Sequence, residues 1–365
     1  DELRETSSFA GFDWWHLLNS LDYCSAYTHN FQRYEHKELI RSFLTADKSF
    51  SGLWMGSYNR SEEYNRYIPW QTIFNGMNTV SWWMGYNNAG GYTWSALEPS
   101  FKELPFFAQA AEEISEIKKG IGRLLLNSEK IKDKIAIYYS ALSVHASTIV
   151  DGPDSGERSL FQAQMNFIYA LKDLGLQFDF VAAEQIKQGK LLPEDYKVLI
   201  MPCVRAIAQE EVDEIKKFVK NGNLLLVDQI PGTMDQYCRE NNENPFAEMF
   251  DDFQKKLTIN TFGAGKTIWF DDFLKTYLSQ RKQGKTAEIK NKFSEILQSV
   301  SLEPSIKISS LDGSELSGIE FSRFRNSDIE FLCLLPDYEN IPSYDTRSFK
   351  IVLQQVWHIY DVREA

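Results

Sequence analysis

The sequence predicts an α/β protein made of three successive regions. In the first, strand-like apolar runs alternate with helical segments, and seven of the nine tryptophans fall within the first 94 residues. In the second, continuous apolar runs are separated by amphipathic helices, which is typical of a parallel sheet covered on both faces. After Pro304, short alternating segments favour antiparallel strands.

The first region is expected to hold parallel strands joined by helices, because strands and helices alternate along it. Three strands with such large polar and aromatic loops make only part of a sheet. In chain order, the expected elements are a strand over 21–27, a helix over 38–44, a strand over 50–55, a helix over 66–77, a strand over 79–84 and a helix over 106–126.

The second region begins near Lys134 and is predicted to be a flavodoxin-like, doubly wound sheet. Gly175 ends one of its helices, and Asn221-Gly222 closes another. The expected strands cover 135–140, 178–182, 197–202 and 223–228, and the expected helices cover 160–174 and 209–219. Beyond them, residues 271–300 are predicted to be helical, and strands are expected over 319–324, 329–335, 349–353 and 356–360.

The charge balance and the lack of long apolar runs limit the possible partners. A net charge of −12 at pH 7 and a pI of about 5.1 argue against nucleic acid or an anionic membrane surface. No apolar run approaches the roughly 20 residues that span a bilayer. The four cysteines are scattered without metal-ligand spacing, so we expect free buried thiols, no metal and no cofactor.

The two ends of the sequence are predicted to be cuts through a longer protein. The chain starts Asp-Glu-Leu-Arg, without a Met or a signal-type segment, so this end identifies no compartment. The other end follows directly on a predicted strand. We expect a soluble protein, with the cytoplasm slightly favoured.

The candidate site lies at the strand ends of the first region, where aromatic and polar residues gather. Loops at the carboxyl ends of parallel strands hold the active sites of β/α enzymes. Flat rings suit the C–H face of a sugar, and a histidine can donate to a hydroxyl; the candidates are Tyr27, His29, Trp54, Trp82 and Trp83. Trp82 and Trp83 alternate, so one of them is expected to be core. Trp54 has the same two interpretations, and His29 is either a ligand contact or part of a strand-end turn.

The segment from Asn59 to Arg66 follows a strand end and precedes a helix. In the functional interpretation, Glu62 or Glu63 supplies a catalytic carboxylate, and Asn59 or Arg60 binds sugar hydroxyls. In the structural alternative, Ser61 is the N-cap of the helix and the two glutamates lie in its first turn, where the helix dipole favours negative charge.

Two further motifs are judged to have no catalytic role. Residues 263–267 (GAGKT) suggest a phosphate-binding loop, but Asn260 stands where its first glycine is required, and a strand-like Ile-Trp-Phe follows instead of a helix. Cys203 follows a strand of the second region, where an amidotransferase nucleophile might be sought. It lacks a Gly-x-Cys-x-Gly turn, and a buried structural thiol is expected instead.

The order of these parts resembles the family 42 glycoside hydrolases, which are β-galactosidases with a (β/α)8 barrel, an amidotransferase-like trimerisation domain and a small β-sandwich. Residues 66–83 (RYIPWQTIFNGMNTVSWW) look like the last barrel helix and the eighth strand. Residues 134–228, with YALKDLGLQFDFV at 169–181 and YKVLIMP at 196–202, are similar to the trimerisation domain.

The resemblance implies that the first half of the barrel is absent, and with it the general acid/base glutamate. The family's nucleophile glutamate ends the seventh strand, which looks like residues 50–56, and its place falls at about Met55. A retaining mechanism needs two carboxylates roughly 5–5.5 Å apart. Either Glu62 or Glu63 has taken the role, or the chemistry differs, or the protein binds without cleaving. The zinc-binding cysteine cluster of some family members is also missing.

The resemblance therefore implies the C-terminal part of a (β/α)8 barrel over 1–126, a trimerisation domain over 127–300 and the start of a β-sandwich over 301–365. The expected activity is hydrolysis of terminal β-glycosidic bonds once the barrel is complete, and the fragment by itself is expected to be inactive. The alternative is an inactive carbohydrate-binding or scaffold protein. Expected partners are a carbohydrate and two further copies in a trimer.

Overall fold

The computed structural model describes residues 13–27, 34–43, 50–56, 61–86, 95–152, 156–250, 257–271, 274–311, 313, 318–337 and 349–353. The chain divides into two compact units. The first unit is Asp1–Leu17 with Lys132–Pro304, and the second is Leu18–Ile131 with Ser305–Ala365. The chain passes between these units three times, after Leu17, after Ile131 and after Pro304.

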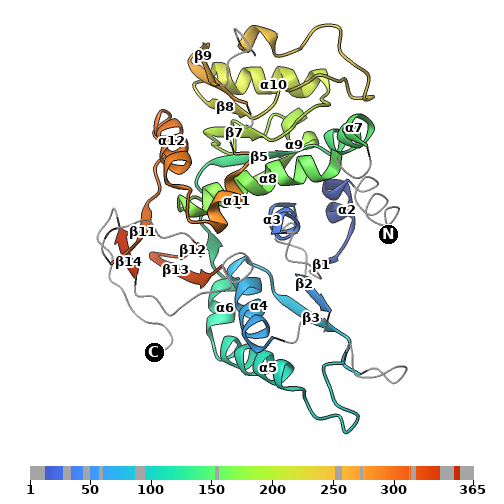
Figure 1. Ribbon diagram of the computed structural model, residues 1–365, viewed down its shortest axis with the longest axis vertical. Coiled ribbons are helices and arrows are strands. Elements are labelled where there is room, and N and C mark those ends of the chain that lie inside the picture. The colour runs from blue at the N-terminus through green and yellow to red at the C-terminus, as the bar shows by residue number, and fades with distance from the viewer. Residues whose placement is uncertain are drawn as a thin grey trace. The chain divides into compact units, whose positions relative to one another are not determined.

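The first unit contains a six-stranded sheet with the order β6-β5-β7-β8-β10-β9 (Figure 1). Its strands are β5 (Ile135–Tyr139), β6 (Phe178–Ala182), β7 (Val198–Met201), β8 (Leu224–Val227), β9 (Leu257–Phe262) and β10 (Gly265–Phe270). All neighbouring pairs are parallel except β9 with β10. The predicted parallel sheet is therefore confirmed, with an antiparallel edge strand that was not predicted.

Helices cover this sheet on both faces, with α10 on one side and α8 on the other (Figure 1). The helical elements of the unit are α7 (Ala141–Asp151), α8 (Gly156–Asp173), α9 (Ala183–Lys187), α10 (Gln209–Lys220), the 3-10 turn η2 (Ala247–Met249), α11 (Tyr277–Lys282) and α12 (Ala287–Gln298). Helix α2 (Trp14–Ser20) begins in this unit. The predicted helical stretch 271–300 thus contains two separate helices.

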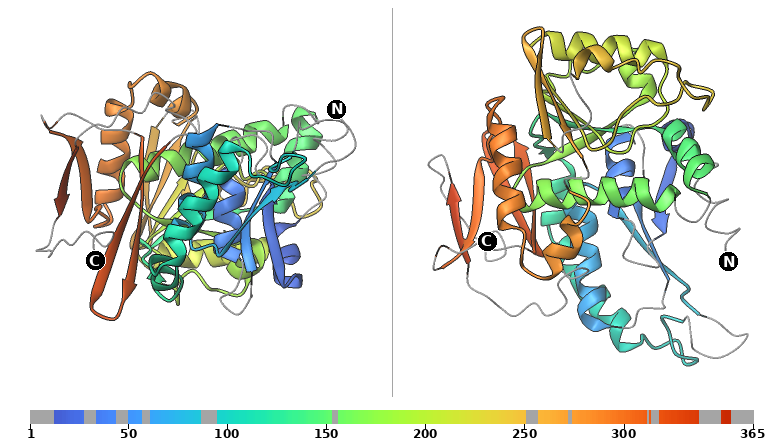
Figure 2. Two further views of the ribbon diagram at one scale, coloured as in Figure 1. Left: turned by 90° about the horizontal axis from the view of Figure 1, so that it is seen from below. Right: turned by 45° about the horizontal axis from the view of Figure 1, so that its top comes forward.

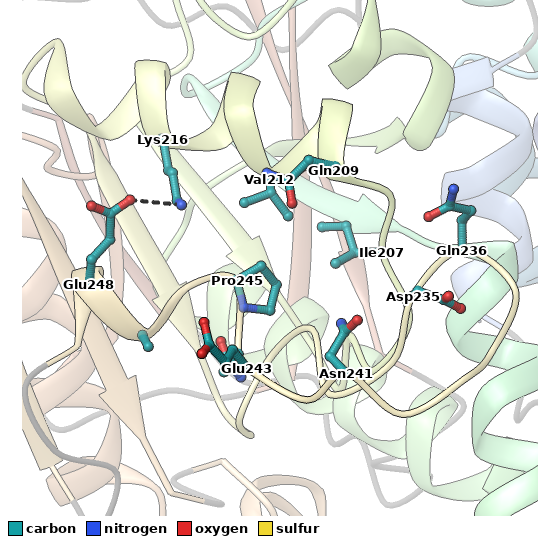
Figure 3. Close-up of a pocket in the computed structure, with 12 residues that line it drawn as sticks. Ile207, Gln209, Val212, Lys216, Asp235, Gln236, Asn241, Glu243, Pro245 and Glu248 are labelled. Atoms are coloured by element: carbon teal, nitrogen blue, oxygen red, sulfur yellow. Dashed lines mark ion pairs between the residues drawn. The ribbon is translucent and has the colours of Figure 1, made fainter.

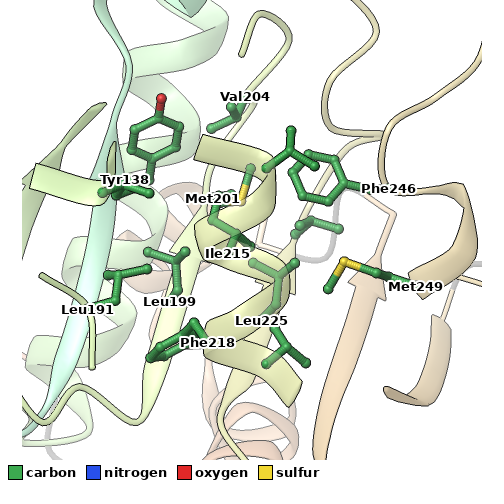
Figure 4. Packing of buried hydrophobic residues seen from close by; sticks show 14 of the residues in the cluster. Tyr138, Leu191, Leu199, Met201, Val204, Ile215, Phe218, Leu225, Phe246 and Met249 are labelled. Atoms are coloured by element: carbon green, nitrogen blue, oxygen red, sulfur yellow. The ribbon is translucent and has the colours of Figure 1, made fainter. Parts of the chain in front are cut away.

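A large hydrophobic core cluster of the first unit lies between the sheet and α10 (Figure 4). Ile215 and Phe218 of α10 face Leu199 and Leu225 of the central strands, and all four side chains are fully buried. Complete burial of such a side chain contributes about 1.5–3 kcal/mol. Every residue of β5, β6, β7 and β8 is buried, which explains why these strands read as continuous apolar runs.

The turn between β9 and β10 contains the motif that suggests a phosphate-binding loop. Gly263 has φ +63°, a conformation that favours glycine, and Gly265 starts the strand β10. An added Cβ at Gly265 would lie 2.1 Å from the Val219 carbonyl oxygen. The glycines therefore serve a hairpin turn and a close backbone contact, and the predicted strand after them is confirmed.

The second unit contains a parallel three-stranded sheet with the order β1-β2-β3. Its parallel strands and helices are β1 (Tyr23–Tyr27), α3 (Tyr34–Phe43), β2 (Phe50–Gly56), α4 (Glu62–Phe74), β3 (Thr79–Trp83), α5 (Pro105–Lys118) and α6 (Ile121–Leu126). The alternation of strands and helices was predicted. The prediction of a single helix over 106–126 was wrong. Two helices, α5 and α6, occupy this stretch, and Gly120 between them has a non-helical backbone with φ 165° and ψ −42°.

Antiparallel strands complete the second unit, as the sequence predicted for the tail. They are β4 (Glu129–Lys130), β11 (Ile306–Ser310), β12 (Ile319–Asn326), β13 (Ile329–Pro336) and β14 (Phe349–Leu353). Figure 2 (left) shows β12 and β13 as a long hairpin drawn in orange and red. Strand β12 also pairs with β4, and β11 pairs with β14. The strand predicted over 356–360 lies outside the described residues.

Candidate functional site

The carboxyl ends of β1, β2 and β3 lie side by side because the three strands are parallel and in register. Tyr27 pairs with Trp54, and Trp54 pairs with Ser81. One position further on, Met55 pairs with Trp82. The backbone of three predicted site residues (Tyr27, Trp54 and Trp82) is therefore gathered at one edge of the sheet.

Trp82 and Trp83 point to opposite sides of β3, as the alternation predicted. The Trp82 indole Nε1–H donates to Asn65 Oδ1 over 2.9 Å, and its ring meets Phe107 edge-on with ring centroids 5.4 Å apart. Trp82 therefore packs against helices α4 and α5. Trp83 is 48% exposed, so its ring lies on the side of the strand away from those helices.

Glu62 and Glu63 lie exposed in the first turn of α4. Ser61 is the N-cap: its Oγ accepts a hydrogen bond from the Tyr64 backbone N–H over 3.2 Å, and its hydroxyl donates to Glu63 Oε2 over 2.7 Å. The hydrogen bond from Ser61 is the main reason why the pKa of Glu63 is lowered. This is the capping arrangement that the sequence analysis gave as the structural alternative.

Asn65 links the helix cap to the strand end. Its side chain is buried; its Nδ2–H donates to the Ser61 carbonyl oxygen over 2.8 Å, while its Oδ1 accepts from Trp82. Asn65 was not among the candidate residues predicted from the sequence. Its position four residues after the predicted N-cap Ser61 could have indicated a contact with that cap, because residues four apart lie on the same face of a helix.

Arg66 and Trp70 lie on the same side of α4 and make polar contacts with α5. The Arg66 guanidinium donates to Gln109, and the Trp70 Nε1–H donates to Glu113 Oε2 over 2.8 Å. Arg66 Nε is also 4.0 Å from Glu113 Oε1. These contacts use the polar atoms of Arg66 and Trp70 to join two helices, so they hold the scaffold next to the strand ends.

Several predicted site residues cannot be placed as side chains. His29, Asn59 and Arg60 lie outside the described residues, and for Tyr27 and Trp54 only the backbone is described. Strand β2 is confirmed over Phe50–Gly56, and its sequence FSGLWMG contains no carboxylate.

The first unit has a separate groove of about 540 Å³ beside the start of α10 (Figure 3). Its apolar lining includes Val212 of α10 and Pro245 of the segment that follows β8. The Lys216 ammonium pairs with Glu248 Oε1 over 2.7 Å at one end. Asp235 and Glu243 add two carboxylates, so the lining disfavours an anion. None of the residues singled out from the sequence lines this groove.

Cys203 is a buried thiol, as predicted. Burial raises its pKa to about 11, and the nearby Asp228 carboxylate acts in the same direction. The Cys203 backbone N–H donates to Asp228 Oδ1 over 2.7 Å. A thiol with this pKa is almost wholly protonated at neutral pH, so it lacks the thiolate that a nucleophile needs.

Residues 133–264 match the family model described as the β-galactosidase trimerisation domain. The match covers strands β5 to β9, and it confirms the resemblance to family 42 glycoside hydrolases inferred from residues 134–228. Among curated proteins, the β-galactosidase BbgII of Bifidobacterium bifidum is 24% identical over 155 residues, which are 41% of this chain and 21% of that protein.

Solved structures show the same fold. The β-galactosidase of Bacillus circulans sp. alkalophilus aligns with a TM-score of 0.67 and 14% identity, over 89% of this chain and 56% of that one. The family 42 exo-carrageenase of Bacteroides ovatus aligns with a TM-score of 0.54 and 13% identity, over 87% and 42%. The chain thus spans about half the length of these structures. Together the comparisons show a match of residues 133–264 to the β-galactosidase trimerisation domain and a fold similar to that of family 42 β-galactosidases.

No helix among the described residues is long and apolar enough to cross a membrane.

Proposed function

We propose that this chain is part of a β-galactosidase-type glycoside hydrolase that cleaves terminal β-glycosidic bonds when its barrel is complete. The observation that carries the proposal is the exposed ring of Trp83 at the carboxyl end of strand β3. The match of residues 133–264 to a β-galactosidase trimerisation domain supports it. Ligands of β/α barrels bind at that end of the strands. The exposed indole offers a flat surface for a sugar ring.

Trp82 has a different part in this proposal. Its N–H and ring are used in contacts with α4 and α5, so it positions the strand end that carries Trp83. Trp54 and Tyr27, on the neighbouring strands, and His29, Asn59 and Arg60 remain proposed contacts for sugar hydroxyls or ring faces.

The proposed chemistry uses two carboxyl groups around an oxocarbenium-like transition state. One protonates the leaving oxygen, and the other attacks or stabilises the anomeric carbon. Glu62 and Glu63 are the proposed sources of the second group. The lowered pKa of Glu63 supports an ionised carboxylate there, as a nucleophile requires. The first group would come from the part of the barrel that this chain lacks.

The test uses the protein with its complete barrel and a panel of aryl β-galactosides and carrageenan oligosaccharides. The panel has both because the similar structures include β-galactosidases and an exo-carrageenase. Glu62→Gln and Glu63→Gln are measured separately. A loss of at least about a hundredfold in kcat/KM is expected for the true nucleophile. If neither variant loses that much, neither glutamate is the nucleophile.

A second candidate function is carbohydrate binding without cleavage. The sequence of β2 favours it, because Phe50–Gly56 holds no carboxylate at the strand end where the resemblance implies a nucleophile. The hydrogen bond that ties Glu63 to its own helix cap favours it as well. Sugar binding measured by calorimetry, with no turnover of any substrate in the panel, would support this second function over the first.

We further propose that the protein assembles as a trimer through the first unit. The match of residues 133–264 to a trimerisation domain supports this assembly. Light scattering of the purified protein should give three times the mass of one chain. A mass equal to that of a single chain over the working concentration range would contradict the assembly.

A further inference from the structure

Three potential metal ligands from distant parts of the sequence meet in the first unit. Asp13 immediately precedes α2, His16 lies in the first turn of α2, and Glu184 lies in α9. His16 Nε2 is 3.8 Å from Asp13 Oδ2 and 3.7 Å from Glu184 Oε1. The three ligand atoms all lie within 4.8 Å of one another.

Local hydrogen bonds already orient the first two ligands. Asp13 Oδ1 accepts from the backbone N–H groups of Trp15 at 2.9 Å and His16 at 3.3 Å, and Asp13 Oδ2 is the oxygen near His16. The Trp14 N–H donates to the Tyr139 hydroxyl over 3.0 Å, which attaches this turn to strand β5. The spacing of three residues puts Asp13 and His16 on neighbouring positions of one helical turn.

The distances suit a shared ion better than direct hydrogen bonds. Separations of 3.7 and 3.8 Å exceed the usual hydrogen-bond range of about 2.7–3.2 Å. Ligands bound at about 2.0–2.2 Å around a tetrahedral zinc ion lie about 3.3–3.6 Å apart. A closure of a few tenths of an ångström would therefore bring His16 and each carboxylate into range, with somewhat more movement between the two carboxylates. All three side chains are partly exposed and can make that adjustment.

We propose that Asp13, His16 and Glu184 form a binding site for a divalent transition-metal ion of the zinc type. One imidazole nitrogen and two carboxylate oxygens are a donor set that zinc accepts, and the imidazole disfavours magnesium and calcium. Solvent completes the coordination, because the His16 side chain is 65% exposed. The ion joins the segment around residue 13 to helix α9, and so it stabilises the first unit.

A lysine ammonium lies beside the proposed site. Lys187 Nζ is 3.8 Å from Glu184 Oε1 and 3.5 Å from the buried Glu211 Oε1. The proposal is independent of the glycosidase activity, since none of these residues belongs to the strand-end site.

The test is calorimetric titration of the metal-free full chain with ZnCl2, with thermal unfolding recorded at each zinc concentration. The wild type should bind zinc and unfold at a higher temperature as zinc rises. His16→Gln and Glu184→Gln should each weaken this binding at least about tenfold and remove the shift. His145→Gln is the matched control, because His145 lies on α7 outside the cluster, and it should behave as the wild type.

The outcomes separate this site from zinc binding elsewhere. The described side chains of His16 and Glu184 are partly exposed, so the two substitutions should leave the zinc-free unfolding temperature nearly unchanged. Equal zinc affinity and stoichiometry in the wild type and both variants would overturn the proposal and assign the binding to other groups, such as the thiols. An absence of any zinc binding to the wild type would overturn it as well.

Discussion

Trp82 and Asn65 join strand β3 to the start of helix α4, through a hydrogen bond of 2.9 Å between the Trp82 indole N–H and the Asn65 amide oxygen. The Asn65 amide in turn donates to the carbonyl oxygen of the N-cap Ser61. The strand end that carries Trp83 is therefore attached to the helix start that carries Glu62 and Glu63. A change at either end of this connection is expected to disturb both groups of candidate residues.

Trp82→Phe tests this connection. The substitution removes a hydrogen bond to the buried Asn65 amide, which should cost about 1–3 kcal/mol of stability. Thermal unfolding should show a lower midpoint for the transition of the second unit. Trp83→Phe is the control, because that ring is half exposed and keeps its aromatic character. Equal midpoints for Trp82→Phe and the wild type would show that the bond contributes nothing measurable.

The Ser61–Glu63 hydrogen bond predicts a pH effect with a defined sign. The folded-state pKa of Glu63 is lower than its ordinary value, so the carboxylate is favoured in the folded protein. Its contribution to stability is present above the unfolded-state pKa and is lost as the pH falls through the folded-state pKa. Ser61→Ala should raise the pKa of Glu63 toward its ordinary value, as followed by NMR titration of the side-chain carboxyl. An unchanged pKa in Ser61→Ala would mean that other groups cause the shift.

The four cysteines should react with a thiol reagent at different rates. Cys24, Cys203 and Cys333 are buried, whereas Cys238 is only partly buried. Burial raises the pKa of Cys203 to about 11 and that of Cys333 to about 12, so few thiolates form at pH 8. Labelling followed by mass spectrometry should modify Cys238 first.

The same labelling experiment also tests whether Cys203 could be an amidotransferase nucleophile. Cys203→Ala should leave any glycosidase activity unchanged and keep the labelling of Cys238. Rapid labelling of Cys203 in the native protein would contradict the buried, protonated thiol described above.

Gly265→Ala should destabilise the first unit strongly. A Cβ at this position would lie 2.1 Å from the Val219 carbonyl oxygen and 2.3 Å from that of Asn223, and both are backbone atoms. Overpacking of a core typically costs about 1–3 kcal/mol and occasionally more, and the clash with two backbone atoms places Gly265→Ala at the upper end of this range. Chemical unfolding should therefore show a much lower midpoint. Gly120→Ala is a suitable comparison, since a Cβ there meets nothing within 4 Å; similar losses in both variants would show that lost glycine flexibility, and not the clash, is responsible.

The parallel strands of the first unit could be predicted from the sequence because they are buried on both faces and read as apolar runs. Helix α7, at Ala141–Asp151, was missed. The hairpin strand β9 was missed too, since its burial alternates irregularly with exposure. The partner of β4 could not be predicted either, because β12 lies nearly 200 residues later in the chain.

For the candidate site, the sequence by itself determined the residue types at the strand ends, the alternation of Trp82 with Trp83 and the capping pattern at Ser61. These are local properties, set by the two-residue period of a strand and by the unpaired N–H groups of a helix start. Only the tertiary structure decided which tryptophan packs against the helices and which is exposed. It also brought Asp13 and His16 close to Glu184. Strand pairing and helix packing join segments that are far apart in the chain, and no local sequence pattern reveals such a contact.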